Sequence, residues 1–102
     1  MHLISRKTLR QFAARYPDAV GALDHWYVQA KVAQWRSLVD VRRVFPHADA
    51  VRVRSDHVAT VFNIAGNKYR LITSIHYDVQ KAFLMLVLTH KEYSAGRWKE
   101  LL

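Results

Sequence analysis

Apolar residues recur every three or four positions through the first third of the chain, which is the spacing of amphipathic helices. A first helix is expected to bury Leu9, Phe12, Ala13 and Tyr16. Ser5 or Thr8 is a candidate cap for its N-terminus, and Pro17 ends it because proline cannot donate a backbone hydrogen bond. Asp18 is then a natural N-cap for a second helix, antiparallel to the first. The second helix is expected to bury Leu23, Trp26, Tyr27, Ala30 and Ala33.

The spacing of apolar residues shortens toward the middle of the chain. Residues 37–44 fit one further helical turn before Phe45-Pro46, although their valines also favour strands. From residue 50 onward the period is two. The alternating residues are Val51, Arg52, Val53 and Arg54. This alternation predicts a short, charged strand at the edge of a sheet.

Longer strands follow in the second half. Residues 57–64 and 68–77 flank Gly66-Asn67, a dipeptide that favours the positive φ angles of a two-residue hairpin loop. Residues 82–88 are apolar at consecutive positions, as in a strand that is covered on both faces. Residues 94–102 fit a last short helix. Helices followed by antiparallel strands predict an α+β domain, with the N-terminal helices packed on one face of a small antiparallel sheet.

The predicted hairpin divides its residues between two faces of this sheet. With a two-residue loop, Asn63 pairs with Arg70, and alternate pairs lie on the same face. The nearly apolar face, expected to pack on the helices, carries Val58, Thr60, Phe62, Ile64, Tyr69, Leu71, Thr73 and Ile75. The other face is open and presents Asn63, Lys68, Arg70 and His76. Such a face is suited to a phosphodiester, because arginine meets phosphate in a bidentate fork, although a solvated face without a ligand has the same pattern.

Charge indicates the kind of partner. The 102 residues, expected to form one domain spanning 1–102, include 16 Lys and Arg against 8 Asp and Glu, a formal net charge of +8. Residues 1–51 and residues 52–102 each contain eight basic and four acidic side chains, so the excess belongs to the fold and favours a polyanion. Without cysteine, disulfides and thiolate zinc sites are excluded. The longest apolar run is too short to span a bilayer, which favours a cytoplasmic protein.

Reactive side chains are concentrated after the apolar strand. Residues 89–93, Thr-His-Lys-Glu-Tyr, place an imidazole, an ammonium, a carboxylate and a phenol within five positions. Cleavage of RNA without a metal needs a base for the 2′-hydroxyl, an acid for the 5′-oxygen and cations for the phosphorane. The side chains of Lys68, Arg70, His90, Lys91 and Tyr93 supply these groups. The six histidines are scattered without the spacing of a ligand pair, so neither a metal nor another cofactor is expected.

Two blocks of sequence place these residues in a family context. The blocks are residues 62–72, Phe-Asn-Ile-Ala-Gly-Asn-Lys-Tyr-Arg-Leu-Ile, and residues 89–93. Together with residues 1–5 and 44–46, they closely resemble the HigB-type toxins of the RelE superfamily, the mRNA interferases of type II toxin–antitoxin systems. The matching positions are Asn63, Gly66, Asn67, Arg70, Thr89, His90, Glu92 and Tyr93. Lys91 replaces a residue that is commonly small and Ser94 replaces the usual Asp, which leaves reduced or altered activity open.

The resemblance implies a RelE-like fold and ribosome-associated cleavage of messenger RNA. It also implies a helix-turn-helix, HigA-like antitoxin that neutralises the toxin and represses their operon, so that operator DNA is bound only through the antitoxin complex. In catalysis, Arg70 is expected on the scissile phosphate, with His90 and Tyr93 as the acid–base pair. His90 is the better acid because imidazole titrates near neutral pH, whereas Tyr93 needs a lowered pKa to act as a base. Lys68 and Lys91 supply positive charge.

Further residues are candidate RNA contacts. They are Asn63, Asn67, His76, Arg52 and Arg54. The last two, with Arg42 and Arg43, form a basic cluster that can hold ribosomal RNA, receive the antitoxin or remain solvated. Two other functions use the same residues without cleavage, namely a non-enzymatic RNA-binding module and a protein-interaction adaptor.

The register between residues 68–77 and the apolar strand stays open. A two-residue loop at Asp78-Val79 sets Thr89 opposite Lys68, whereas a three-residue loop sets His90 there. Only the second register places His90 on the face of Arg70.

Overall fold

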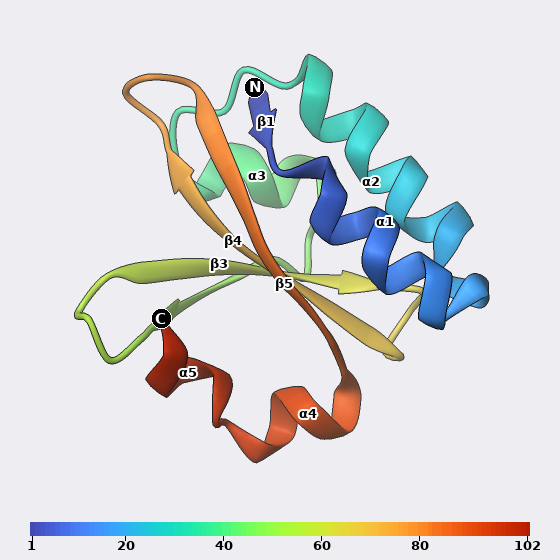
Figure 1. Cartoon of the computed structure of the whole chain (residues 1–102). Helices are drawn as coiled ribbons and strands as arrows, with labels where there is room; N and C mark the ends of the chain where they lie inside the picture. The colour runs from blue at the N-terminus through green and yellow to red at the C-terminus, as the bar shows by residue number, and fades with distance from the viewer.

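The computed structural model describes all 102 residues and contains a five-stranded sheet flanked by helices (Figure 1). The strands are β1 (His2–Ile4), β2 (Asp49–Arg52), β3 (Val58–Ile64), β4 (Tyr69–His76) and β5 (Lys81–Thr89). The helices are α1 (Arg6–Arg15), the 3-10 helix η1 (Pro17–Ala19), α2 (Val20–Val32), α3 (Leu38–Val44), α4 (His90–Ala95) and α5 (Trp98–Leu101). These elements confirm the predicted α+β class.

The sheet is mixed and has the order β1-β5-β4-β3-β2. β2 lies at one edge, as its alternating arginines predicted. β1 lies at the other edge and pairs parallel with β5, with Leu3 opposite Ala82. The prediction of a purely antiparallel sheet was therefore wrong. Three residues are too few to show a period, and the partner strand lies almost a chain length away.

The N-terminal helices form the thicker layer of the core. α1 and α2 run in opposite directions on one face of the sheet, as predicted (Figure 1). A cluster of 16 buried residues joins this layer to the sheet. At its centre, the ring centroid of Phe62 lies 5.1 Å from that of Trp26 and 6.2 Å from that of Trp35. The two tryptophans therefore belong to the core.

The second face of the sheet, which the hairpin pattern predicted to be open, is partly covered. The C-terminal helices return beneath it, and Trp98 packs with Val61 and Ile72 in a cluster of five buried residues. Elsewhere the face remains accessible, with Phe83 38% exposed and Met85 36% exposed. The prediction failed beneath Trp98 because the pattern of one hairpin carries no information on a later segment that folds back.

The β4–β5 ladder contains both of the registers that the sequence left open. Near the loop, His76 pairs with Lys81, as a two-residue loop requires. A β-bulge with Met85 as the additional residue then shifts the pairing by one position. Beyond the bulge, the backbone N–H of His90 donates to the carbonyl of Lys68 at 2.9 Å. The bulge thus brings His90 opposite Lys68.

The predicted β3–β4 register is confirmed, but its turn differs in detail. Asn63 pairs with Arg70, and the ladder ends at Ile64. The positive φ angles fall on Ala65 at 53° and Gly66 at 69°, one position earlier than the predicted Gly66-Asn67 pair.

Two helix ends also depart from the predictions. Asp18 lies within η1 and does not cap α2, whose N-cap position is Ala19. The C-terminal helix begins at His90 instead of residue 94, and Gly96, at a φ of 78°, separates α4 from α5. Pro17 does end the first helix, as predicted.

Candidate active site

The guanidinium of Arg70 is the most enclosed charge at the end of the sheet where the β3–β4 turn meets α4. Arg70 is 8% exposed, so it does not stand on an open face as predicted. Its Nη1 donates to the backbone carbonyls of Asn67 at 3.2 Å and Tyr69 at 3.0 Å. Its Nη2 donates to the side-chain Oδ1 of Asn67. Three of the five guanidinium N–H groups are thus used, which leaves two for an anion.

Tyr93 forms the wall against which this guanidinium packs. The Cζ atom of Arg70 lies 5.3 Å from the centroid of the Tyr93 ring, a cation–π contact. The Tyr93 ring also stacks on the Trp98 ring, with 5.4 Å between centroids, and the indole Nε1 donates to the Tyr93 carbonyl at 3.1 Å. Burial raises the pKa of Tyr93, and the opposing effect of Arg70 is smaller. The lowered pKa that a tyrosine base requires is therefore not found.

His90 is exposed at the first position of α4, where Thr89 caps the helix. The Thr89 hydroxyl accepts from the backbone N–H of Glu92 at 3.2 Å, and the Glu92 carboxylate accepts from the Thr89 N–H at 2.9 Å. This reciprocal pair is a capping box, which the spacing Thr-x-x-Glu would have revealed in the sequence. It directs the chain out of the sheet at His90. Ser94, the departure from the family pattern, lies 3.5 Å from the imidazole Nδ1 through its Oγ.

Lys68 is drawn toward the helical layer instead of toward Arg70. Its Nζ lies 2.6 Å from the Asp18 carboxylate, which also accepts a hydrogen bond from the Tyr69 hydroxyl at 2.7 Å. The hydrogen bonds from Lys68 and Tyr69 lower the pKa of Asp18, and the same carboxylate raises the pKa of Tyr69 to about 12. Asp18, which was predicted to cap a helix, therefore anchors the hairpin turn to η1. No local pattern in the sequence indicates this long-range contact.

The remaining candidate RNA contacts do not gather at one place. Asn63 pairs with Arg70 and is exposed, and Lys91 is exposed on α4. His76 lies six residues from Arg70 along β4, which corresponds to about 20 Å of strand. Its imidazole packs edge-on against the ring of Phe83, with 5.3 Å between the ring centroids. His76 therefore shares the sheet face of Arg70, as the hairpin pattern predicted, but lies at the other end of the strand.

Arg52 and Arg54 lie toward the same distant end of the sheet as His76. Arg52 pairs with Val58, at the start of β3, and its guanidinium forms a 2.8 Å ion pair with Asp56. The backbone N–H of Arg54 donates to the carbonyl of Lys99, within α5. Arg52 lies on β2 and Arg70 on β4, and both Arg52 and Arg54 lie at the opposite end of the sheet from Arg70.

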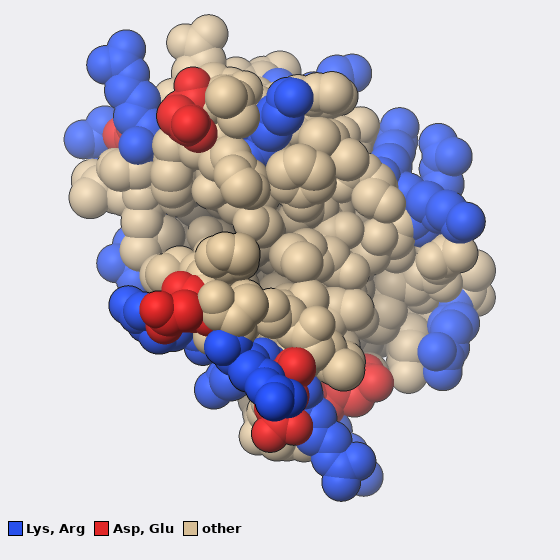
Figure 2. Space-filling view, turned by 60° about the vertical axis from the view of Figure 1, so that its left-hand side comes forward, with Lys and Arg blue, Asp and Glu red and all other residues tan.

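Positive charge is distributed around the molecule. In Figure 2, Lys and Arg lie along the margins of the face, whose centre is formed by uncharged residues. Of the second basic cluster, Arg42 and Arg43 form ion pairs with Asp49 and Asp40, which reduce its net charge. No three His, Cys, Asp or Glu side chains form a possible metal site, and none of the helices has the length and hydropathy to cross a membrane.

Comparison with known proteins gives this geometry a family. Residues 19–96 match the HigB toxin family, described as the RelE-like toxic component of a toxin–antitoxin system. The chain is 31% identical over 93 residues to the mRNA interferase toxin HigB of Escherichia coli strain K12, covering 91% of this chain and 88% of that protein. The mRNA interferase HigB of Escherichia coli O6:H1, strain CFT073, is 28% identical over the same shares.

This chain is a member of the HigB toxin family, which confirms the resemblance of its two sequence blocks. The match includes the β3–β4 turn with Arg70, the start of α4 with His90, and Tyr93. The two segments that carried the resemblance are therefore the ones that meet at the candidate site.

Proposed function

We propose that this chain is an endoribonuclease that cleaves messenger RNA, and that Arg70 binds the scissile phosphate. The observation that carries the proposal is the enclosed guanidinium, held by Asn67 and packed on Tyr93, with two N–H groups left for phosphate oxygens. A cation held in place before the reaction stabilises a phosphorane more than a mobile one, because no reorganisation is needed. The similarity to proteins named mRNA interferases supports the same reaction.

His90 is the proposed general acid. Its backbone is hydrogen-bonded to Lys68, two residues before Arg70, so the imidazole and the guanidinium share one end of the sheet. An exposed imidazole can reach a bound RNA and protonate the 5′-oxygen as the bond to phosphorus breaks. Because the pKa of Tyr93 is raised, its hydroxyl stays protonated, and we assign its ring the role of positioning the Arg70 guanidinium through the cation–π contact.

The two lysines receive different roles. Lys91 is exposed next to His90 and has no ion-pair partner, so it is the proposed source of additional positive charge on the RNA. Lys68 is engaged with Asp18 and serves to position the turn. Asn67 is likewise a positioning residue, since both of its oxygens accept from Arg70. None of the roles proposed for Lys91, Lys68 and Asn67 requires a metal ion.

The proposed biological setting follows from the family and from its sequence signature. Cleavage takes place on translating ribosomes in the cytoplasm, and a helix-turn-helix antitoxin of the HigA kind neutralises the chain. Operator DNA is bound only through the complex with that antitoxin. Support for the antitoxin comes from the family description, which is that of a toxic component of a toxin–antitoxin system.

Single-turnover cleavage of a ribosome-bound message, with binding measured separately by sedimentation, tests the proposal. His90→Gln keeps polarity and approximate size but cannot deliver a proton near neutral pH. It is expected to bind within a few-fold of the wild type and to cleave at least about a hundredfold more slowly. The matched control is His76→Gln at the far end of β4, which should cleave at the wild-type rate.

The alternative is the non-enzymatic RNA-binding module. A wild-type protein that binds RNA but leaves it intact would establish this alternative. Equal cleavage by His90→Gln and wild type would remove His90 from the mechanism and pass the acid role to Tyr93 or a lysine.

A further inference from the structure

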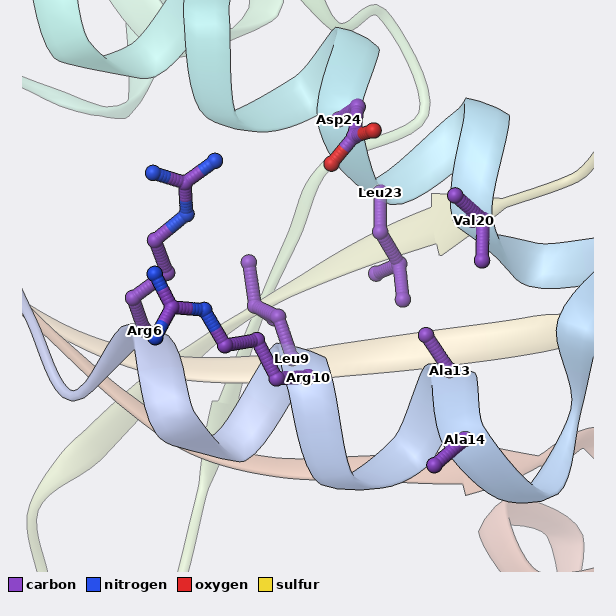
Figure 3. A pocket seen from close by; sticks show the side chains of 8 residues that line it. All are labelled: Arg6, Leu9, Arg10, Ala13, Ala14, Val20, Leu23 and Asp24. Atoms are coloured by element: carbon purple, nitrogen blue, oxygen red, sulfur yellow. The ribbon is translucent and has the colours of Figure 1, made fainter.

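A groove of about 410 Å³ opens between α1 and α2, in the helical layer (Figure 3). Its lining residues are Arg6, Leu9, Arg10, Ala13, Ala14, Val20, Leu23 and Asp24. The hollow exists because α1 contributes the small side chains of Ala13 and Ala14 where α2 contributes Val20 and Leu23. Val20 is 42% exposed, so apolar surface is accessible to a partner. The groove lies across the sheet from α4 and α5, which pack on the other face.

The basic residues of α1 form no ion pairs within the chain. α1 contains four basic residues, Arg6, Lys7, Arg10 and Arg15, and no acidic one. None of these four takes part in the ion pairs of the structure. Figure 3 shows the guanidinium groups of Arg6 and Arg10 at the same end of the groove. The Cζ atom of Arg6 lies 4.3 Å from the Tyr27 ring centroid, a contact that leaves its N–H edge free for carboxylates.

The composition of the groove favours a protein segment over RNA. Its floor is apolar and fits an aliphatic side chain, a group that RNA does not carry. Asp24 in the wall disfavours any anion beside it, so the acidic residues of a ligand are expected beside Arg6 and Arg10. Arg6 and Arg10 attract carboxylates that flank the apolar side chain. The complementary ligand is therefore an amphipathic segment with acidic residues beside an apolar anchor.

We propose that the groove between α1 and α2 is the docking site for the antitoxin, through an acidic segment whose apolar side chain inserts between Ala14 and Val20. This inference rests on the antitoxin of the proposed function, but not on the chemistry assigned to Arg70 and His90. The occupied groove would leave the candidate active site uncovered, because the two lie on different faces of the sheet.

Titration of the purified chain with the purified product of its neighbouring antitoxin gene tests this docking site. Ala14→Trp fills the groove, and Arg6→Glu combined with Arg10→Glu reverses its charge. Each is expected to raise the Kd at least about tenfold, since a tenfold change corresponds to about 1.4 kcal/mol. Matched controls on the same helix are Gln11→Trp and the pair Lys7→Glu and Arg15→Glu, none of which lines the groove. These should bind within about threefold of wild type.

Wild-type affinity in both groove variants, or equal losses in the controls, overturns the docking site. So does a wild-type chain that does not bind the antitoxin. A larger loss of RNA affinity than of antitoxin affinity assigns the groove to RNA instead. Thermal unfolding of each variant establishes that it is folded, and cleavage is measured in parallel. If wild type does not cleave RNA while the groove variants lose antitoxin binding, the proposed chemistry fails and the docking site stands.

Discussion

The two faces of the sheet are stabilised to different extents. On one face α1 and α2 enclose 16 buried residues, whereas on the other α4 and α5 enclose five. α4 and α5 are also short, at six and four residues, and helices of that length depend on tertiary packing for their stability. The thin layer nevertheless carries His90 and Tyr93. The candidate active site is therefore built on the less stable side of the molecule, where local opening costs less than global unfolding.

This comparison predicts how charge acts at the site. Arg70 connects the stable hairpin to the thin layer, so its loss should affect catalysis more than any other change. Arg70→Lys keeps the charge but removes the planar fork held by Asn67. Cleavage is expected to fall about 10²- to 10³-fold, because the phosphorane loses its pre-positioned donors. Arg52→Lys, at the distant end of the sheet, should have no effect on the single-turnover rate. Comparable losses in the two variants would contradict the assignment of Arg70.

A second prediction separates the two layers through their tryptophans. Trp26→Ala removes a ring from the 16-residue cluster and should cost about 3–5 kcal/mol of unfolding free energy in urea denaturation. Trp98→Ala should cost less globally, because α4 and α5 can detach while the rest stays folded. For cleavage activity, the order of the two variants should be the opposite of their order in lost stability. Per folded molecule, Trp26→Ala keeps near-wild-type cleavage, and Trp98→Ala loses it with the Tyr93 stack. Equal activity in the two variants would mean that the thin layer does not carry the site.

The distant end of the sheet offers a smaller test. If Arg52 and Arg54 contact RNA, the logarithm of affinity should fall with the logarithm of salt concentration by about 0.7 per neutralised phosphate on a single strand. Replacing both by alanine should then reduce the steepness of that slope by the amount expected for about one to two phosphate contacts. Because Arg52 already pairs with Asp56 and both arginines lie far from Arg70, we expect little change. A clearly flatter slope would extend the RNA-binding surface along the whole sheet.

The smallest expected effect concerns the anchor between η1 and the hairpin turn. The folded state lowers the pKa of Asp18, so its contribution is present above the unfolded value and is lost as the pH falls through the folded one. The pKa of Tyr69 is raised from 10.0 to about 12, so its contribution is present below pH 10 and is lost as the pH rises toward 12. Asp18→Asn should flatten the unfolding free energy in both windows. An unchanged pH profile would mean that this contact does not stabilise the fold.

Local pattern determined much of this protein from its sequence. The pattern of apolar residues predicted α1, α2 and the strands β2 to β5, and the predicted hairpin was enough to pair Asn63 with Arg70. The Thr89–Glu92 spacing is that of the capping box at which α4 begins. The two blocks that carried the family resemblance were short and contiguous. Each of these features depends on residues that are close in the chain, so the sequence alone specifies them.

Tertiary structure decided where those elements meet. The bulge at Met85 set His90 opposite Lys68, because the pairing of a strand depends on irregularities that periodicity does not register. Trp98 covers a face that the hairpin alone would leave open. Asp18 does not cap a helix but binds the side chains of Lys68 and Tyr69, which lie 50 and 51 residues away. These outcomes are set by burial and by pairing of charges between distant segments. Composition showed that the chain was basic, but only the fold separated the enclosed Arg70 from the arginines at the distant edge.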